Sequence, residues 1–227
     1  MQPLFRRHTD ILRETVPLDG RSVLEVGCGG GRLLGWLARE GAMAVGLDPG
    51  LEQLARARVE APATSLVAGR GEALPFESGR FDLVLYFNSL HHVPLQSQWQ
   101  ALAEAARVLA TGGDLLVVEP LAEGNHFALL QPLEDETEVR REAFRVLHAA
   151  ATLGLRMIKE AFYATRIVEP NWPSVRARFV AVNPDRAARI AVLGAELERL
   201  FESSGEPVEG GRAFVQPMRL NLLRRGP

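Results

Sequence analysis

A glycine cluster directly after a short apolar run constrains the fold of this chain more than any other feature. The run is Ser22–Val26, and the cluster Gly27-Cys-Gly-Gly-Gly31 leads into a helical pattern at Leu33–Arg39. A short apolar run bounded by turn residues is typical of a buried strand. Glycine adopts positive φ and lets the backbone approach a ligand closely, and a helix start offers free N–H groups. The segment therefore predicts a strand, a turn suited to a ligand, and a helix.

The same alternation continues as far as Pro120. Further strands are predicted at Ala42–Leu47, Thr64–Ala68, Phe81–Phe87 and Asp114–Glu119, and helices at residues 4–15, Leu51–Glu60 and Gln98–Leu109, the last closed by Thr111-Gly-Gly113. Strands that alternate with helices indicate an α/β fold with a mostly parallel sheet. Near-continuous hydrophobicity in Phe81–Phe87 predicts burial on both faces.

Beyond Pro120 the pattern changes. It predicts a long helix at Glu134–Leu153, a strand at Phe162–Val168, a turn at Asn171–Ser174, a helix at Pro184–Phe201 with Asn183 as its N-cap, and a last strand at Arg212–Leu223. The stretch from about 170 to 211 exceeds a simple strand-to-strand link. We expect it to form a small cap inserted before the final strand.

Composition excludes several classes of protein. With 227 residues, 47% of them apolar, the chain has the size and balance of a single globular domain over 1–227. A net charge of -2 gives no general attraction to nucleic acid, and no apolar run approaches the ~20 residues of a membrane span. The N-terminal residues lack a secretory pattern, so we expect a cytoplasmic protein. The single cysteine, Cys28, excludes an intrachain disulfide.

Arginine is unevenly distributed. Residues 140–227 hold 15 basic residues against 9 acids, whereas residues 1–139 hold 11 against 19. Solvated helix faces explain this in part. The alternative is that arginines of the C-terminal part, among them Arg166, Arg176 and Arg178, bind a carboxylate or phosphate of a substrate.

Glycine spacing separates two classes of cofactor. A dinucleotide site has a small third residue in G-x-G-x-x-G, but here that position is Arg32. The glycines lie instead at 27, 29 and 31. Asp48, at the end of the second predicted strand, is placed to accept hydrogen bonds from ribose hydroxyls, or else to cap the helix that follows. We therefore predict an adenosyl-type ligand at the carboxyl ends of these strands.

Six motifs in order carry a resemblance to a known family. They are Glu25-Val-Gly-Cys-Gly-Gly-Gly31, Gly46-Leu-Asp48, Gly71-Glu-Ala-Leu-Pro-Phe76, Phe81-Asp-Leu-Val84, Leu90-His-His-Val93 and Arg107-Val-Leu109 with Gly112–Val118. Together they resemble class I S-adenosylmethionine (SAM) dependent methyltransferases, especially small-molecule enzymes of the ubiquinone and menaquinone type. The resemblance implies a Rossmann-like, doubly wound, mostly parallel seven-stranded sheet with helices on both faces. It also implies a SAM-binding core at 20–120, a substrate-side helix and cap at about 121–211, and a final strand at 212–224.

The resemblance also implies roles for single residues. It places the cofactor's methionine part over the loop of Gly27, Cys28, Gly29 and Gly31, with Glu25 near its amino group. It places the ribose at Asp48 and Pro49, the adenine at Gly71 and Glu72, and the methionine part or the methyl group beside Asn88 and Ser89. Where the family often has an acid, this chain has Arg70, which leaves the adenine contacts open.

Two adjacent histidines are the candidate catalytic residues. His91 and His92 follow the fourth predicted strand, where a general base for the acceptor would lie. For each one, packing of the loop is the alternative. A metal site is not predicted, since no third ligand stands at a recognisable spacing.

The sequence therefore predicts a SAM-dependent methyltransferase that acts on a small molecule and uses SAM as cofactor. Two alternatives remain, a SAM-binding regulatory protein without turnover and an NAD(P)-dependent oxidoreductase. The acceptor, the methylated atom and the oligomeric state are not predicted.

Overall fold

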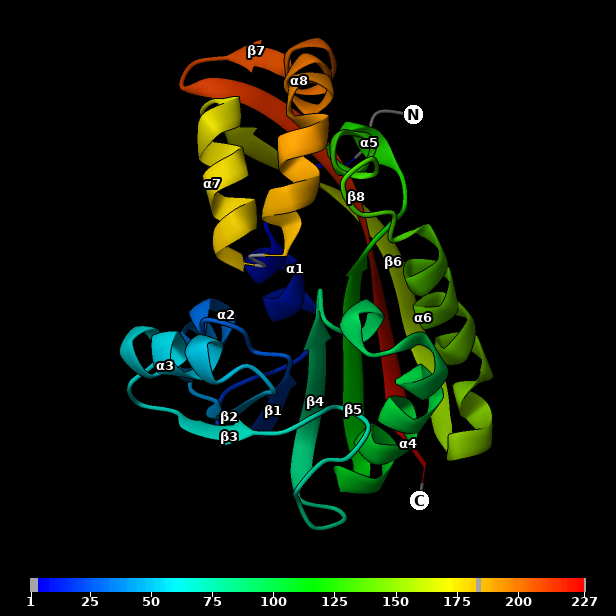
Figure 1. Cartoon of the computed structure of the whole chain (residues 1–227). Helices are drawn as coiled ribbons and strands as arrows, with labels where there is room; N and C mark the ends of the chain where they lie inside the picture. Colours follow the sequence, from blue (N-terminus) through cyan, green and yellow to red (C-terminus); the bar gives the residue numbers. More distant parts are fainter. Residues whose placement is uncertain (1–3, 183–184, 227) are drawn as a thin grey trace. The chain divides into compact units, whose positions relative to one another are not determined.

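An eight-stranded, mostly parallel sheet runs through the computed structural model, which describes residues 4–182 and 185–226 (Figure 1). The strand order is β3-β2-β1-β4-β5-β8-β6, and β7 pairs with β8 beside this path. The strands are β1 Ser22–Val26, β2 Met43–Asp48, β3 Ser65–Ala68, β4 Phe81–Phe87, β5 Leu109–Pro120, β6 Leu155–Glu169, β7 Glu206–Val208 and β8 Gly211–Arg225. The α/β prediction is confirmed, but the expected count of seven strands missed the short β7, which pairs antiparallel with β8.

Helices connect most of these strands. The α-helices are α1 His8–Thr15, α2 Arg32–Arg39, α3 Leu51–Glu60, α4 Gln98–Val108, α5 Gly124–Leu130, α6 Thr137–Ala149, α7 Trp172–Val182 and α8 Arg186–Ser204. Short 3-10 turns lie at η1 Leu90–His92, η2 Leu95–Ser97 and η3 Ala150–Leu153. None of the helices in the described part of the chain is long and apolar enough to cross a lipid bilayer.

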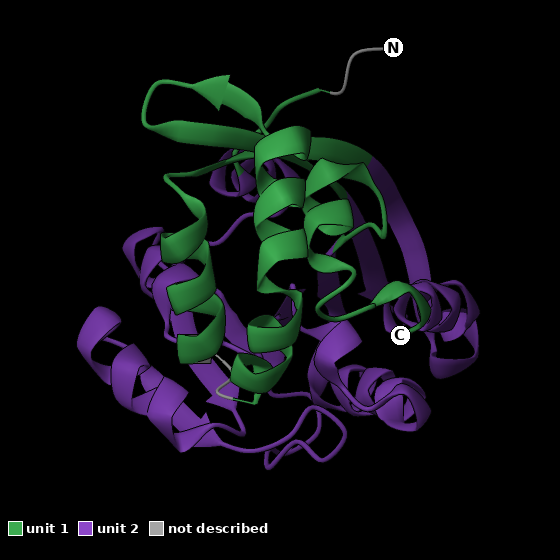
Figure 2. Cartoon of the chain, turned by 45° about the horizontal axis from the view of Figure 1, so that its top comes forward, with its two compact units in different colours: residues 1–7, 120–138, 162–218 green, residues 8–119, 139–161, 219–227 purple. Residues whose placement is uncertain are grey.

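The chain divides into two compact units (Figure 2). Unit 1 comprises residues 1–7, 120–138 and 162–218, and unit 2 comprises residues 8–119, 139–161 and 219–227. Each has an apolar cluster of its own. In unit 2, Leu24, Val84 and Leu115 belong to it, and in unit 1, Trp172, Phe201 and Phe214. The description of 1–227 as one domain stays a prediction.

Parallel pairing at the centre of unit 2 gathers loops at one edge. β1 pairs with β2 and with β4, and β4 pairs with β5, all in parallel. Residues Leu83–Tyr86 are fully buried, which confirms the expected burial of β4 on both faces. Because parallel strands end at the same edge, the loops after β1, β2 and β4 meet there.

The prediction of a turn at Asn171–Ser174, in unit 1, is wrong. This segment begins α7, since Asn171 Oδ1 accepts the N–H of Ser174 at 2.9 Å. Asparagine and proline are typical of turns, but they are equally typical of a helix start, where Asn caps and Pro fits the first turn. The expected N-cap of α8, Asn183, lies outside the described residues.

Other boundaries also differ from expectation. Helix α1 begins at His8 instead of residue 4, and Phe5 forms an isolated bridge with Ala164 of β6. Helix α6 begins at Thr137 because Asp135 Oδ1 accepts its N–H at 3.0 Å. Helix α4 ends at Val108, and β5 starts at Leu109 instead of 114. Helix α5 was not predicted.

Gly31 provides a test of how α2 packs on α3. Its φ is +81°, and an added Cβ would lie 2.8 Å from the Cα and Cβ of Ala57. We expect Gly31→Ala to lower the free energy of unfolding by about 2–5 kcal/mol, combining backbone strain with overpacking. Gly20→Ala is the matched control because its φ is +70° and its Cβ would meet no atom within 4 Å. It should cost about 1–2 kcal/mol. Urea unfolding measures both, and equal losses would contradict this packing.

Candidate functional site

A cavity of about 600 Å³ lies in unit 2 at the carboxyl ends of β1, β2 and β4. Its walls include these predicted site residues: Gly27, Gly29, Asp48, Pro49, Gly71, Glu72, Asn88, Ser89 and His92. The other predicted residues, Glu25, Cys28, Gly31 and His91, are not part of its lining. The structure thus brings together four loops, those after β1, β2, β3 and β4, that lie far apart in the sequence.

The glycine loop uses its residues in different ways. All of Gly27, Gly29 and Gly31 have positive φ. A Cβ on Gly27 would lie 2.6 Å from Ser89 Cβ, so glycine permits the close approach of the two loops. A Cβ on Gly29 would meet nothing within 4 Å, and Gly29 lines the cavity. Gly31, in contrast, is required by packing against α3.

Asp48 fastens the glycine loop to the end of β2. Its Oδ2 accepts the N–H of Gly29 at 2.9 Å, and its Oδ1 accepts the N–H of Gly50 at 2.8 Å. A carboxylate offers about four acceptor sites, so two amide bonds leave capacity for two more donors. The carboxylate can therefore hold the loop and still accept hydrogen bonds from hydroxyl groups in the cavity.

The loop after β4 carries the main strain in the site. Asn88 has φ 52°, the one positive φ of a non-glycine residue in the described chain. Its N–H donates to Val118 O at 2.8 Å, while its buried Oδ1 has no hydrogen-bond partner in the described structure. Such strained residues concentrate at functional sites. Next to it, Ser89 Oγ donates to Val26 O at 2.6 Å and joins this loop to β1.

Glu119, at the end of β5, holds the same loop from the other side. Its Oε1 accepts the N–H groups of Ser89 at 3.1 Å and Leu90 at 2.8 Å, and its Oε2 contacts His91 Nδ1. Burial acts to raise the pKa of Glu119, but the charge and hydrogen bond of His91 outweigh burial and lower this pKa overall. Sequence reasoning missed Glu119. The available signal was an acid at the end of an otherwise apolar strand.

The two histidines have different surroundings. His91 is 3% exposed, and its ring contacts the carboxylate of Glu119. These surroundings fit the alternative in which His91 packs the loop and is not a general base. His92 lines the cavity, and its ring centroid lies 4.1 Å from that of His91. The geometry therefore favours His92 over His91 for contact with a ligand.

Two buried groups, Cys28 of the glycine loop and Glu25 of β1, differ in chemistry. Burial, with the nearby charges of Glu25 and Asp48, raises the pKa of the Cys28 thiol to about 12. The thiol is therefore protonated and fills space. Burial and the charge of Asp48 also raise the pKa of Glu25 well above its usual value. Glu25 Oε2 has no hydrogen-bond partner among the described residues.

The loop after β3 closes the remaining wall. Arg70 Nη1 lies 4.0 Å from Glu72 Oε1, and the Arg70 side chain is 73% exposed. Gln53 of α3, Val93 and Pro94 also line the cavity. Sequence reasoning assigned no role to these three: Gln53 and Pro94 lie outside the six motifs, and Val93 closes the motif Leu90-His-His-Val93 without being singled out as a site residue.

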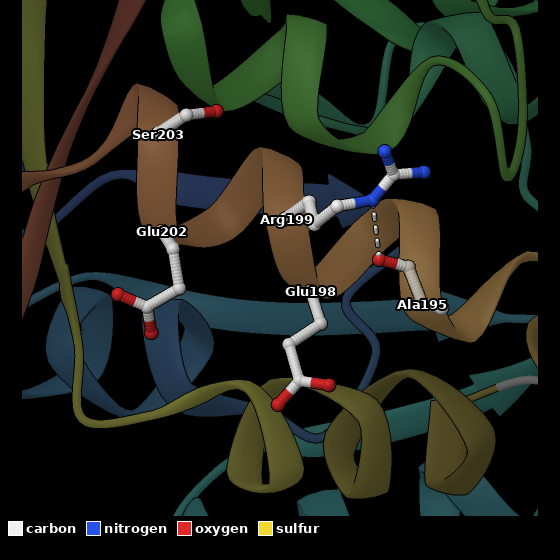
Figure 3. A pocket seen from close by; sticks show the side chains of 5 residues that line it. All are labelled: Ala195, Glu198, Arg199, Glu202 and Ser203. Atoms are coloured by element: carbon white, nitrogen blue, oxygen red, sulfur yellow. Dashed lines mark hydrogen bonds between the residues drawn. The ribbon is translucent and has the colours of Figure 1, made fainter.

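A second cavity, of about 720 Å³, lies in unit 1 along α8 (Figure 3). Its lining consists of Ala195, Glu198, Arg199, Glu202 and Ser203. Arg199 Nε donates to the Ala195 carbonyl of the same helix at 3.2 Å, and Glu202 pairs with Arg212. Arg199 and Glu202 thus bond within the unit, and none of the predicted site residues is part of this cavity.

Known proteins show which family this chain resembles. A family model described as "Methyltransferase domain" matches residues 24–117. Over 205 residues the chain is 33% identical to phthiotriol/phenolphthiotriol dimycocerosates methyltransferase 1 of Mycobacterium ulcerans, covering 87% of this chain and 70% of the relative. The chain belongs to the class I SAM-dependent methyltransferases. This confirms the resemblance of the ordered motifs.

Other relatives match a smaller share of the chain. An uncharacterized methyltransferase of Synechocystis is 38% identical over 100 residues, 44% of this chain, and a ubiquinone biosynthesis O-methyltransferase of Sodalis glossinidius is 38% identical over 113 residues, 46% of this chain. These matches cover 47% and 43% of the two relatives, so the chain aligns with about half the length of each.

Solved structures agree on the methyltransferase fold. A SAM-dependent methyltransferase from Mesorhizobium loti has a TM-score of 0.56 at 20% identity, covering 95% of this chain and 96% of that one. The [4+2]-cyclase SpnF has a TM-score of 0.66 at 20% identity, covering 96% of this chain and 80% of that one. Since a cyclase has this fold, the fold alone does not establish methyl transfer.

Glu119→Gln tests the anchoring of the loop after β4. We expect it to lower the free energy of unfolding at pH 7 by about 3–5 kcal/mol, because one partner of a buried pair is lost. Because the pKa of Glu119 is lowered in the folded state, its ionised carboxylate stabilises the fold above pH 4.5, the usual pKa of this group. This stabilisation is lost as the pH falls through the folded-state pKa of Glu119. The difference between wild type and variant should therefore shrink below about pH 4.5.

Chemical denaturation between pH 3.5 and 7 measures this difference. Glu52→Gln, on the exposed first turn of α3, is the control and should stay within about 0.5 kcal/mol of wild type. A difference between wild type and Glu119→Gln that does not vary with pH would contradict the anchoring role.

Proposed function

We propose that this protein transfers a methyl group from SAM to a small-molecule acceptor. The observation that carries the proposal is the cavity in unit 2, where the glycine loop, Asp48 and Asn88 face one space at the carboxyl ends of parallel strands. Ligands of open α/β sheets bind at this edge.

A buried acceptor atom in the cavity wall supports the fit of SAM. Asn88 lines the cavity, and its Oδ1 has no donor among the described residues. Buried acceptors without a donor are costly, and an amino acid ammonium group brings N–H donors of the kind that this atom lacks. Asp48, with acceptor capacity left after its two amide bonds, would receive ribose hydroxyls, and Gly29 leaves space for the ligand.

The residues of this chain chiefly position the reactants. SAM supplies the reactive methyl group in an in-line displacement. Asn88 and Ser89 are held by Val118, Val26 and Glu119, so this wall of the cavity is fixed before ligands bind. Such preorganisation is what a displacement needs, since near-attack geometry requires about 3–3.5 Å between the reacting atoms.

His92 is the candidate general base for an acceptor hydroxyl or acidic carbon. It lines the cavity, whereas the His91 ring is bonded to Glu119. We assign His91 as a positioning residue that fixes the loop and packs against His92.

A second candidate function is SAM binding without methyl transfer. The observation that supports it is that a protein named as a [4+2]-cyclase shares this fold, so the fold also occurs with a reaction other than methyl transfer. It predicts cofactor binding without formation of S-adenosylhomocysteine on any acceptor. An acceptor screen, with release of S-adenosylhomocysteine as the signal, separates the two functions.

Calorimetric titration with S-adenosylhomocysteine and with NAD tests the cofactor. We expect S-adenosylhomocysteine to bind and NAD to bind more weakly or not at all. Asp48→Ala should weaken S-adenosylhomocysteine binding about 10- to 100-fold, because hydrogen bonds to a charged group are worth about 1.5–3 kcal/mol. Preference for NAD would overturn the assignment.

Asp82→Ala is the matched control for this titration. Asp82 also accepts hydrogen bonds, from Ser22 N–H at 2.9 Å and Ser22 Oγ at 2.7 Å, but it lies at the start of β4, away from the cavity. Asp82→Ala should lower the stability of the fold but leave the affinity for S-adenosylhomocysteine within about threefold of wild type. That change is smaller than the loss of one hydrogen bond to the ligand would cause.

His92→Gln tests the general base. With an acceptor found by the screen, we expect kcat to fall about 10²- to 10⁴-fold, the usual contribution of general base catalysis, while S-adenosylhomocysteine affinity changes little. His148→Gln, on the exposed side of α6, is the control and should leave kcat unchanged. An unchanged kcat in His92→Gln would show that positioning alone accounts for the rate.

A further inference from the structure

Arg219 of β8 is a buried cation in unit 2 with a fixed orientation. It is 3% exposed. Its guanidinium carbon lies 3.9 Å from the centroid of the Phe144 ring, and its Nε donates to Asn221 Oδ1 at 2.7 Å. Asn221 is itself held, because its Nδ2 donates to Glu160 Oε2 at 2.8 Å. Ring stacking and this hydrogen bond together fix the plane of the guanidinium.

The outer edge of this guanidinium has no partner among residues 4–182 and 185–226. Only Nε is hydrogen-bonded, so the N–H donors of Nη1 and Nη2 have no bond to a described residue. The contrast with Arg107 is clear, since Arg107 uses Nε, Nη1 and Nη2 on Glu104, Phe76 and Leu74. A buried cation without a bonded anion is costly, so the unused edge of Arg219 points to a ligand.

The charge of Arg219 persists despite burial. Burial lowers the pKa of Arg219 to about 10, while the charges of Glu119 and Glu160 act to raise it. At neutral pH the side chain is therefore a cation. Neither carboxylate lies within ion-pair distance of it among the described contacts, so their charge offsets part of the cost of burial but leaves the donors unused.

Glu119 connects Arg219 to the cofactor cavity. Its carboxylate binds the backbone of Ser89 and the ring of His91, and Ser89 and His92 line the cavity. Glu119 stands on β5 and Arg219 on β8, which are neighbouring strands of the sheet. Arg219 therefore lies on the strand next to the one whose end holds this wall of the cavity, and the charge of Glu119 acts to raise the pKa of Arg219.

We propose that Arg219 binds a carboxylate group of the acceptor through Nη1 and Nη2. The proposal rests on the proposed function, because it assigns a chemical feature to the acceptor of that site. The two Nη donors at the end of a guanidinium match the two oxygens of a carboxylate in a bidentate pair. Because Nε already donates to Asn221 Oδ1, a carboxylate would have to approach the end of the guanidinium that carries Nη1 and Nη2.

Two of the arginines that the sequence singled out, Arg166 and Arg178, are less suited to this role. Arg166 Nη2 pairs with Glu206 at 3.0 Å, and Arg178 pairs with Glu169. Both side chains are about half exposed, at 47% and 50%. Arg166 and Arg178 are exposed to solvent and paired with acids of unit 1. Arg219, in contrast, is buried, and its Nη1 and Nη2 donors have no hydrogen-bond partner among the described residues.

Titration of carboxylate probes tests the proposal. Wild type saturated with S-adenosylhomocysteine is titrated with acetate, benzoate and decanoate, and with the neutral analogue benzamide, using ligand-observed NMR. We expect at least one carboxylate to bind and benzamide to bind at least tenfold more weakly than benzoate. Arg219→Gln should weaken carboxylate binding at least tenfold. Arg219→Lys, which keeps the charge but loses the planar pair of donors, should be intermediate.

Arg166→Gln is the matched control and should bind as wild type does. Failure of every carboxylate to bind wild type, or equal binding to Arg219→Gln, would overturn the proposal. Titration of each variant with S-adenosylhomocysteine shows whether its cofactor site is intact. If Arg219→Gln fails to fold, the result with Arg219→Lys decides, and wild-type affinity in that variant would count against the paired geometry. If wild type does not bind S-adenosylhomocysteine, that result would instead count against the proposed function.

Discussion

The carboxylate of Glu119 holds the loop on which the candidate site depends. It stands at the end of a buried strand, accepts two backbone N–H groups of the loop after β4 and contacts the ring of His91. An ionised carboxylate without such partners would be too costly to bury there. The loop is therefore fixed in the one arrangement that satisfies Glu119. That arrangement turns Asn88, Ser89 and His92 toward the cavity.

A second carboxylate acts in the same way on the other side of β1. Asp48 accepts N–H groups from Gly29 and Gly50, so the glycine loop and the start of α3 are tied to the end of β2. Parallel strands leave loops with unpaired backbone groups at their carboxyl edge, and these two acids bind several of them. Both carboxylates thus shape the cavity, while Asn88 Oδ1 is left as a buried acceptor for a ligand.

Sequence alone predicted the N-terminal half well because its signals are local. The apolar runs, the glycine cluster and Asp48 each stand next to the element they define, so β1, α3 and β4 were placed to within a residue. The roles of Gly31, Glu119 and Arg219 depend on contacts with Ala57, Ser89 and Phe144, which are distant in sequence. The error at Asn171 has a different cause, since asparagine begins turns and helices by the same hydrogen bond.

A crystal structure of the protein with S-adenosylhomocysteine bound tests whether the cavity in unit 2 is the SAM site. We expect ligand density in the unit 2 cavity, with the ribose hydroxyls within hydrogen-bond distance of Asp48 and the amino group against Asn88 Oδ1. The loops of Gly29 and Ser89 should keep their present hydrogen bonds, since Asp48 and Glu119 fix them in advance. Density at another place, or a loop after β4 that changes conformation and releases Glu119, would contradict this assignment of the site.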